Sequence, residues 1–202
     1  HYTIHVREKC SDKETKAFMA VVPNPDDRVY NEESPFGLDG AFAWVVDKSE
    51  VDGLLLAEKL AGCVWNRDRM SIKSLYNSKG EIDFSLTNNR EVFKKTKELG
   101  MCSMPCIVYF PSDMTVAENS MIADDLLGVY KFGLAMGKEY GNSVADYELW
   151  NEPEVDNIQT TPSDTADRFS GMIKALSLGI ADSGTGAKVS SPGFTGNMES
   201  YL

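Results

Sequence analysis

Hydrophobic and polar residues alternate singly at the start of the chain and later form longer repeating blocks. Residues 2–9 have the period-two pattern of a half-buried strand, and after a polar stretch the apolar residues 17–22 form a second strand, so the two predict a β-hairpin. A two-stranded hairpin is marginally stable alone, so we expect residues 1–22 to belong to a β-rich domain. Residues 23–35 are rich in proline, asparagine and acidic residues and predict a linker.

From residue 36 onward, apolar strand-like segments alternate with amphipathic helical segments, which predicts a parallel sheet built from βα units. In the first of these strands the apolar part is residues 41–46, and Ser49 is the expected N-cap of the first helix. The predicted strands are 36–46, 63–70, 101–110, 147–151 and 188–194, and the predicted helices are 48–61, 88–99, 123–140 and 162–182.

The fourth of these strands ends in the sequence Asp146-Tyr-Glu-Leu-Trp-Asn-Glu-Pro153. Pro153 cannot continue a central strand, so the strand must stop there and the backbone must turn outward. Parallel α/β barrels place catalytic groups in the loops at the carboxyl ends of their strands. We therefore take Glu152 as the functional centre.

Trp-Asn-Glu-Pro after an apolar strand resembles the fourth strand of the clan A glycoside hydrolases, which are retaining enzymes on a (β/α)8 barrel. The resemblance covers residues 36–202. It implies that Glu152 is the general acid/base and that Asn151 binds the sugar 2-hydroxyl group. With Trp65-Asn-Arg-Asp-Arg69 and Ser191-Pro-Gly193, the motif looks most like the β-xylosidase and α-L-iduronidase family. The expected fold is α/β: about the first five βα units of a TIM barrel, preceded by the hairpin.

The second barrel strand ends in an unusually charged sequence. The resemblance implies an arginine here that orients the nucleophilic carboxylate, and Arg67 is the best match. The alternative is that Arg67 pairs locally with Asp68 at the rim and has no part in catalysis. Glu148 lies deeper on the fourth strand and would need a cationic partner, such as an arginine of the second strand.

Two aromatic residues are further candidates for substrate binding. Trp150 shares the inward parity of Glu152 along the strand, and we expect it to support the acid. Tyr109 stands at the end of the third predicted strand. It either stacks on a sugar ring or fills the top of the barrel, and the sequence favours neither.

The length of the chain limits what it can encode. Its 202 residues fall short of the roughly 250 of an eight-unit barrel. In clan A the nucleophilic glutamate stands at the end of the seventh strand, and only five strands are predicted. We therefore expect the nucleophile beyond residue 202, and the remainder of the barrel from residues outside this segment. The start at His1 indicates a processed or excised piece.

Charge and composition exclude several partners. A net charge of −11 argues against nucleic acid, whose phosphates need a basic face, and fits a neutral oligo- or polysaccharide better. The only histidines are His1 and His5, and the four cysteines lack metal-ligand spacing, so we expect no metal and no cofactor. No apolar run is long enough to cross a bilayer. We expect a soluble protein, extracellular or periplasmic, without membrane partners.

The sequence thus favours a retaining glycoside hydrolase active in polysaccharide degradation. The main alternative is a carbohydrate-binding or scaffold protein that keeps the barrel without turnover, because a fold does not fix a function. A metal-dependent barrel hydrolase is disfavoured, since the barrel segment holds no histidine.

Overall fold

The computed structural model describes residues 2–7, 13–19, 33–115, 122–153 and 165–195. The strands β1 (Tyr2–Arg7) and β2 (Glu14–Met19) pair antiparallel in a two-stranded sheet of their own, which confirms the predicted hairpin. Most of the predicted linker lies outside the described residues.

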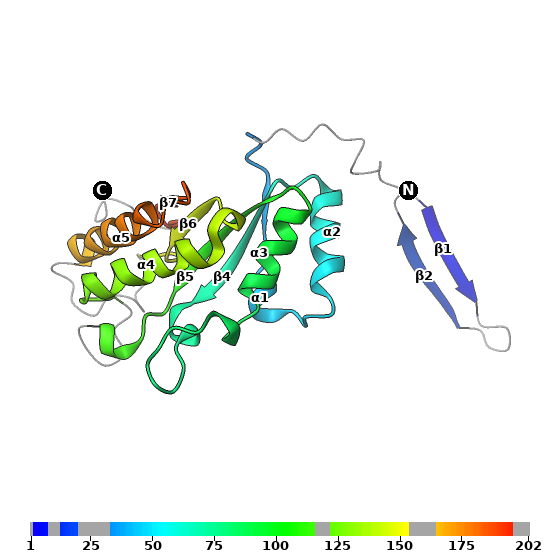
Figure 1. The fold of residues 1–202 in the computed structure, drawn as a ribbon. Helices are drawn as coiled ribbons and strands as arrows, with labels where there is room; N and C mark the ends of the chain where they lie inside the picture. The colour runs from blue at the N-terminus through cyan, green and yellow to red at the C-terminus, as the bar shows by residue number, and fades with distance from the viewer. Residues whose placement is uncertain (1, 8–12, 20–32, 116–121, 154–164, 196–202) are drawn as a thin grey trace.

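The body of the molecule is a five-stranded parallel sheet whose strands follow one another in sequence order. Right-handed crossovers that always advance to the next strand place their helices on the same face of the sheet. Figure 1 shows the four long helices side by side along the sheet. The strands are β3 (Gly37–Asp39), β4 (Trp65–Ser71), β5 (Cys102–Val108), β6 (Asp146–Leu149) and β7 (Lys188–Ser190); the helices between them are α2 (Val51–Ala61), α3 (Asn89–Glu98), α4 (Leu126–Tyr140) and α5 (Thr165–Asp182).

This arrangement of five parallel strands and the four long helices between them confirms the expected fold, a partial TIM barrel with a separate small hairpin. The shorter elements lie in the connections between strands and helices. They are α1 (Phe42–Val45), η2 (Ile72–Leu75), η3 (Phe84–Leu86), η4 (Ser112–Met114) and η5 (Gly141–Ser143). No helix in the described ranges is long and apolar enough to cross a membrane.

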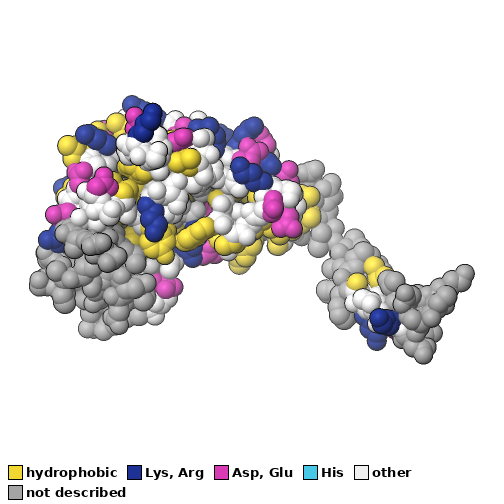
Figure 2. Space-filling model, turned by 90° about the horizontal axis from the view of Figure 1, so that it is seen from below, with side chains coloured by type: hydrophobic (Ala, Val, Ile, Leu, Met, Phe, Trp, Pro, Cys, Tyr) yellow, Lys and Arg dark blue, Asp and Glu magenta, His cyan; other side chains and the backbone are white. Residues whose placement is uncertain are grey.

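Large hydrophobic side chains remain exposed around the first barrel strand. Phe36 is 72% exposed and Leu38 is 48% exposed, and Trp44 and Val45 of α1 are exposed as well. Figure 2 shows hydrophobic side chains at the surface around the middle of the α/β body. In a barrel the inner face and edges of these strands contact the remaining strands, so an open sheet leaves them uncovered.

The first barrel strand ends earlier than the sequence predicts. Residues 41–46 were expected to be its apolar part, but the strand is β3, and most of this run belongs to the short helix α1. Two contacts explain the difference. The Asp68 carboxylate accepts hydrogen bonds from the Ala43 amide, at 3.0 and 3.2 Å, near the start of α1. The Phe42 side chain is buried in the core. The apolar run therefore packs a rim helix against β4.

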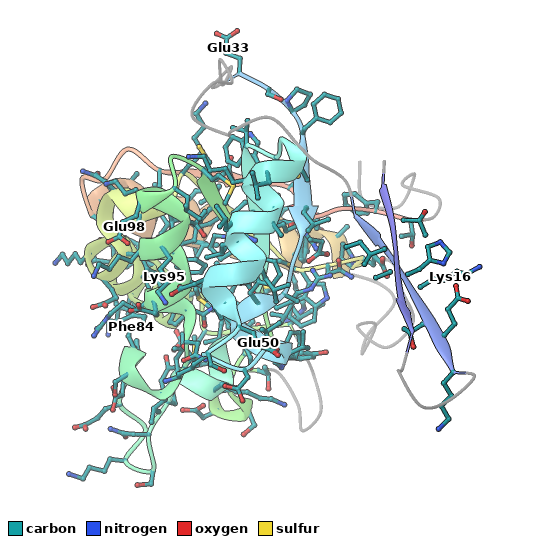
Figure 3. The ribbon with its side chains drawn as sticks, turned by 90° about the vertical axis from the view of Figure 1, so that its right-hand side faces the viewer. Lys16, Glu33, Glu50, Phe84, Lys95 and Glu98 are labelled. Carbon is teal, nitrogen blue, oxygen red and sulfur yellow. The ribbon has the colours of Figure 1, made fainter. Side chains whose placement is uncertain are left out.

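The ends of α2 follow the sequence only in part. The helix closes at Gly62, as predicted, with a left-handed φ of 95°. Ser49 was expected to be its N-cap, which is wrong: Glu50 occupies that position without a side-chain cap hydrogen bond. The Ser49 hydroxyl and amide instead donate to the Asp47 carboxylate. Figure 3 shows Lys95 of α3, which forms an ion pair with Asp52 of α2 across the helix layer.

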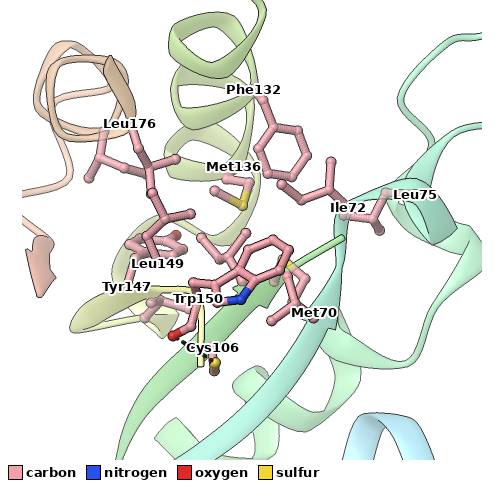
Figure 4. Packing of buried hydrophobic residues seen from close by; sticks show 14 of the residues in the cluster. Met70, Ile72, Leu75, Cys106, Phe132, Met136, Tyr147, Leu149, Trp150 and Leu176 are labelled. Atoms are coloured by element: carbon pink, nitrogen blue, oxygen red, sulfur yellow. Dashed lines mark hydrogen bonds between the residues drawn. The ribbon is translucent and has the colours of Figure 1, made fainter. Parts of the chain in front are cut away.

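The core lies between the sheet and the helices. Figure 4 shows Leu176 of α5 on the side of Leu149 and Tyr147 of β6, and Phe132 of α4 pointing toward Ile72. The helices α4 and α5 approach closely because glycines line their contact. A Cβ atom added at Gly179 would lie 2.1 Å from the Tyr130 carbonyl oxygen, and one at Gly133 would lie 2.8 Å from the Leu176 carbonyl oxygen.

Substituting Gly179 by alanine should therefore destabilise the fold. The new methyl group meets backbone, which cannot move aside, and overpacking of this kind costs roughly 1–3 kcal/mol. Gly53 in α2 is a matched control, because a Cβ atom there meets nothing within 4 Å. Gly53→Ala should leave stability unchanged or raise it by about 0.5–1 kcal/mol through helix propensity. Urea denaturation measures both, and equal effects of the two variants would contradict the close packing of α4 on α5.

Alternation along β4 divides its polar residues between two environments. Asn66 and Asp68 are fully buried on the helix side, whereas Arg67 and Arg69 lie on the other face. The Asn66 amide donates to Glu58 Oε2 at 2.9 Å. Glu58 Oε1 and Asn66 Oδ1 are buried, and neither has a hydrogen-bond partner among the described residues. A proton on the Glu58 carboxyl group can supply the donor that these two acceptors lack.

We expect the stability of the fold to fall between pH 4.5 and pH 7. Burial, then the Asp68 charge, raises the pKa of Glu58 from 4.5 to about 7 despite the Asn66 hydrogen bond. The fold thus favours protonated Glu58, and stability falls as pH rises through this window, by at most about 3 kcal/mol. Glu58→Gln, which cannot ionise, should match the wild type at pH 4.5 and be more stable at pH 8 in urea titrations. Equal stability of the two proteins at pH 8 would contradict this assignment.

Candidate active site

The centre of the candidate site is a pair of charges that spans three strands. Arg67 of β4 donates from Nε to Glu148 Oε2 at 2.5 Å and from Nη2 to Glu148 Oε1 at 2.9 Å. In the strand between them, the residue in register with Glu148 is Cys106, whose small side chain lets the arginine reach across. The predicted partner of Glu148 is confirmed as an arginine of the second barrel strand. The alternative pairing of Arg67 with Asp68 is wrong, since Asp68 faces the helices.

Two further residues bridge the arginines of β4. Asp39 Oδ2, at the end of β3, accepts from Arg67 Nη1 at 2.5 Å and from Arg69 Nη2 at 2.8 Å. Asn151 Oδ1, just after β6, accepts from Arg67 Nη2 at 3.0 Å and from Arg69 Nη1 at 3.2 Å. The hydrogen bonds therefore close a ring, which we call the arginine ring. Its members are Asp39, Arg67, Asn151 and Arg69.

Partial burial makes these interactions stronger than they would be in water. Glu148 is 4% exposed, so its charge depends on Arg67 for compensation. Burial alone would lower the pKa of Arg67, but the hydrogen bonds and charges of Glu148 and Asp39 raise it above its ordinary value. Burial and the Glu148 charge raise the pKa of the Cys106 thiol to about 11. At neutral pH the thiol is protonated, and it donates to the Trp150 carbonyl oxygen at 3.4 Å.

Glu152 lies beyond the carboxyl end of β6, where the chain meets the residues that follow β7. Its amide donates to the Gly193 carbonyl oxygen at 2.9 Å, and Asn151 forms a parallel bridge with Gly193. The Gly193 amide in turn donates to Glu148 Oε1 at 2.9 Å. The Glu152 side chain is half-buried, and within the described part of the chain its carboxylate has no hydrogen bond or ion pair.

The backbone is strained at this end of the sheet. Four described residues other than glycine have a left-handed φ, and each follows the carboxyl end of a strand: Ala41 (48°), Tyr109 (58°), Trp150 (75°) and Glu152 (52°). Such conformations cost roughly 1–3 kcal/mol each and persist only where surrounding contacts hold them. Strained residues cluster at functional sites, so their gathering here supports this rim as the site.

Three aromatic side chains lie in a row at the same rim. The Tyr109 ring contacts Trp150 edge to face at 6.0 Å on one side and Trp44 at 6.1 Å on the other. Trp150 is 3% exposed and lies beside Met70 in the core (Figure 4), whereas Trp44 of α1 is 52% exposed. Lys73 Nζ lies 5.0 Å from the centre of the Tyr109 ring.

A hollow of about 420 Å³ lies along the inner face of the sheet next to the arginine ring. Asp39 and Arg67 belong to both the hollow and the ring. The hollow therefore borders the charged network and extends from it to Trp65 and Asp146, the first residues of β4 and β6. Its lining is Pro35, Gly37, Leu38, Asp39, Trp65, Arg67, Met104 and Asp146.

Comparison with solved structures finds glycoside hydrolases. A family 39 glycoside hydrolase from Bacteroides cellulosilyticus WH2 matches 89% of this chain and 35% of its own, with a TM-score of 0.60 and 17% identity. Endoglucanase Cel5A from Thermotoga maritima matches over 77% and 50% (TM-score 0.54, 16% identity). The endo-1,4-β-mannanase from Rhizomucor miehei matches over 78% and 56% (TM-score 0.59, 14% identity).

These similarities establish the fold: the chain shares part of the barrel of glycoside hydrolases. It spans about a third to just over half the length of these neighbours. No family model matches the sequence, and a search of curated proteins finds no match to it. Identities of 14–17% do not by themselves carry an activity to this chain.

Of the predicted site residues, Arg67 and Asn151 are in direct contact in the structure. Glu152 directly follows Asn151 in the sequence. Tyr109 and Trp150 contact each other. Asp39 and Trp44 were not predicted as site residues, and of the two arginines that could point at the mouth of the site, Arg67 was preferred to Arg69. Asp39 was missed because the predicted first strand ran to residue 46, which placed Asp39 within the strand and not at its carboxyl end.

Removing one partner of the Arg67–Glu148 pair should be costly. Arg67→Met leaves the Glu148 carboxylate buried without compensation, and we expect a loss of roughly 3–5 kcal/mol in the free energy of unfolding. Adding Glu148→Met to that variant should recover part of the loss. Arg90→Met is the control, because Arg90 and its partner Glu139 form a surface pair worth less than about 1 kcal/mol. Urea denaturation measures the free energy of unfolding of each variant. If the losses caused by Arg67→Met and Glu148→Met were additive in the double variant, that result would contradict the pairing.

Proposed function

We propose that this chain is part of a retaining glycoside hydrolase in which Glu152 is the general acid/base. The observation that carries the proposal is the position of Glu152. It follows the carboxyl end of a parallel barrel strand, next to Asn151 and the arginine ring, in a fold shared with glycoside hydrolases. Catalytic groups of such barrels lie at this end of the strands.

The chemistry requires a second carboxyl group roughly 5–5.5 Å from the first. In the proposed reaction Glu152 protonates the leaving glycosidic oxygen while the second carboxylate attacks the anomeric carbon. Glu152 then removes a proton from water, which releases the sugar. We place the nucleophile beyond residue 202, on strands that complete the barrel. The open inner face and the greater length of the structural neighbours support this placement.

The other site residues have supporting roles in this proposal. Arg67 would orient the ionised nucleophile by hydrogen bonding, and Glu148 and Asp39 hold its guanidinium group in place. Asn151 binds a sugar hydroxyl, Tyr109 stacks on or bounds the sugar, and Trp150 supports the loop that carries Glu152. The finer resemblance to the β-xylosidase and α-L-iduronidase family suggests an oligo- or polysaccharide as substrate.

A carbohydrate-binding protein without turnover is the second candidate. The exposed Trp44 beside Tyr109 would serve a binder as well as an enzyme, since both present aromatic rings to sugars. The Glu152 carboxylate favours the enzyme, because a binder gains nothing from an acid held in a strained turn. Turnover separates the two candidates.

Glu152→Gln in the full-length protein should lower the hydrolysis of aryl glycosides by about 10²–10⁴-fold. The loss should be smallest with a 2,4-dinitrophenyl leaving group, which departs without protonation, and largest with poor leaving groups. Initial rates over a panel of aryl glycosides measure this dependence. Glu98→Gln, at an exposed position of α3, is the matched control and should leave the rates unchanged.

Azide provides the second arm of this experiment. In Glu152→Ala, azide should restore turnover of the activated substrate and yield a glycosyl azide of retained configuration, because the anion attacks the glycosyl-enzyme without a general base. Binding of oligosaccharide without turnover in the wild type would favour the binding protein. Full activity of Glu152→Gln on every substrate would remove the assigned role.

A further inference from the structure

The arginine ring determines which side of the Asn151 amide faces a ligand. Asn151 Oδ1 lies 3.0 Å from Arg67 Nη2 and 3.2 Å from Arg69 Nη1. A guanidinium group carries only donors, so an amide nitrogen in that position would bring donor against donor. The oxygen must therefore face the two arginines. The Nδ2 group then points away from them, with two N–H donors to offer.

Arg69 differs from Arg67 in the hydrogen-bond partners of its guanidinium group. Arg67 is committed to the Glu148 carboxylate by two hydrogen bonds and is thus part of the frame of the sheet. The side-chain hydrogen bonds of Arg69 within the described residues go to Asp39 and Asn151, and its guanidinium also lies against the Cys106 thiol. The Arg69 side chain thus joins the rim residue Asp39 to the amide next to Glu152.

The charges of the site allow two guanidinium groups to lie this close together. Asp39 accepts from both arginines and Glu148 binds Arg67 bidentately, so two carboxylates balance two cations. Asn151 is the neutral member of the arginine ring, and its amide oxygen is the acceptor that both cations share. Charge-assisted hydrogen bonds from both arginines therefore hold this amide in one orientation.

We propose that Arg69 is a positioning residue which, with Asp39, fixes the Asn151 amide so that its N–H group donates to an acceptor oxygen of the bound sugar. The inference rests on the proposed function for the sugar, but the orientation of the amide is a property of the protein alone. A donor at this place sets specificity. It accepts a hydroxyl group at the contacted sugar carbon and rejects an ammonium group there, which has only donors.

The orientation is tested without any substrate. Asn151→Asp keeps an acceptor oxygen facing both arginines, whereas Asn151→Leu has none. We expect the urea midpoint of Asn151→Asp to equal or exceed that of the wild type, and the midpoint of Asn151→Leu to fall. Equal losses in the two variants would overturn the orientation, whatever the activity of the protein.

The positioning role is tested by turnover of a parent aryl glycoside and its monodeoxy analogues. The variant Asn151→Ala identifies the sugar hydroxyl that Asn151 contacts. The deoxy analogue that lacks this hydroxyl is turned over more slowly than the parent substrate by the wild type, but not by the variant. Arg69→Met should lower kcat/KM on the parent substrate by about 3–10-fold, the value of one hydrogen bond. It should lower kcat/KM on that deoxy analogue by less than twofold, since the affected contact is already missing.

If Arg69 had a merely structural role, Arg69→Met would lower kcat/KM on the parent substrate and on the deoxy analogue by the same factor. That result would overturn the proposal. Arg90→Met removes a surface arginine bound to Glu139 and is the control, with rates unchanged on both substrates. Failure of the proposed function has a different outcome: the wild type hydrolyses no glycoside, while the stability difference between Asn151→Asp and Asn151→Leu persists.

Discussion

The bidentate contact between Arg67 and Glu148 is the interaction on which the rest of the site depends. It joins β4 to β6 across β5, and it compensates the charge of a carboxylate that is almost fully buried. With Glu148 held, its Oε1 atom also accepts from the Gly193 amide, which brings the residues after β7 against the end of β6. One ion pair thus aligns the carboxyl ends of strands that are far apart in sequence.

Strand order explains why charged residues can occupy this interior. Consecutive parallel strands put all four long helices on one face, so the other face receives polar side chains without competing with the core. The period of two along β4 separates its residues accordingly, with Asp68 toward α1 and Arg67 toward the hollow. A shift of one residue in register would exchange these environments and bury Arg67 among the helices.

The sequence predicted the parts of the site that depend on short-range patterns. The strand that precedes Glu152 was predicted because its motif is contiguous. An arginine of the second barrel strand was predicted as the partner of Glu148 because a buried carboxylate requires a cation. Residues 41–46 were assigned wrongly, since a short apolar run fits a buried strand and a rim helix equally well. The capping contact from Asp68 decides between them, and it comes from 25 residues further along the chain.

The position of Glu152 finally depends on β7 as much as on its own strand. A left-handed φ at a glutamate is unfavourable, and so is the same conformation at Trp150 two residues earlier. Both amides are nevertheless bonded: Trp150 to the Ile107 carbonyl oxygen at 2.8 Å and Glu152 to that of Gly193 at 2.9 Å. Because one bond goes to β5 and the other to the residues after β7, the turn is held from both neighbouring strands. The role proposed for Glu152 needs such support, since small displacements of a reacting group cost much of the rate.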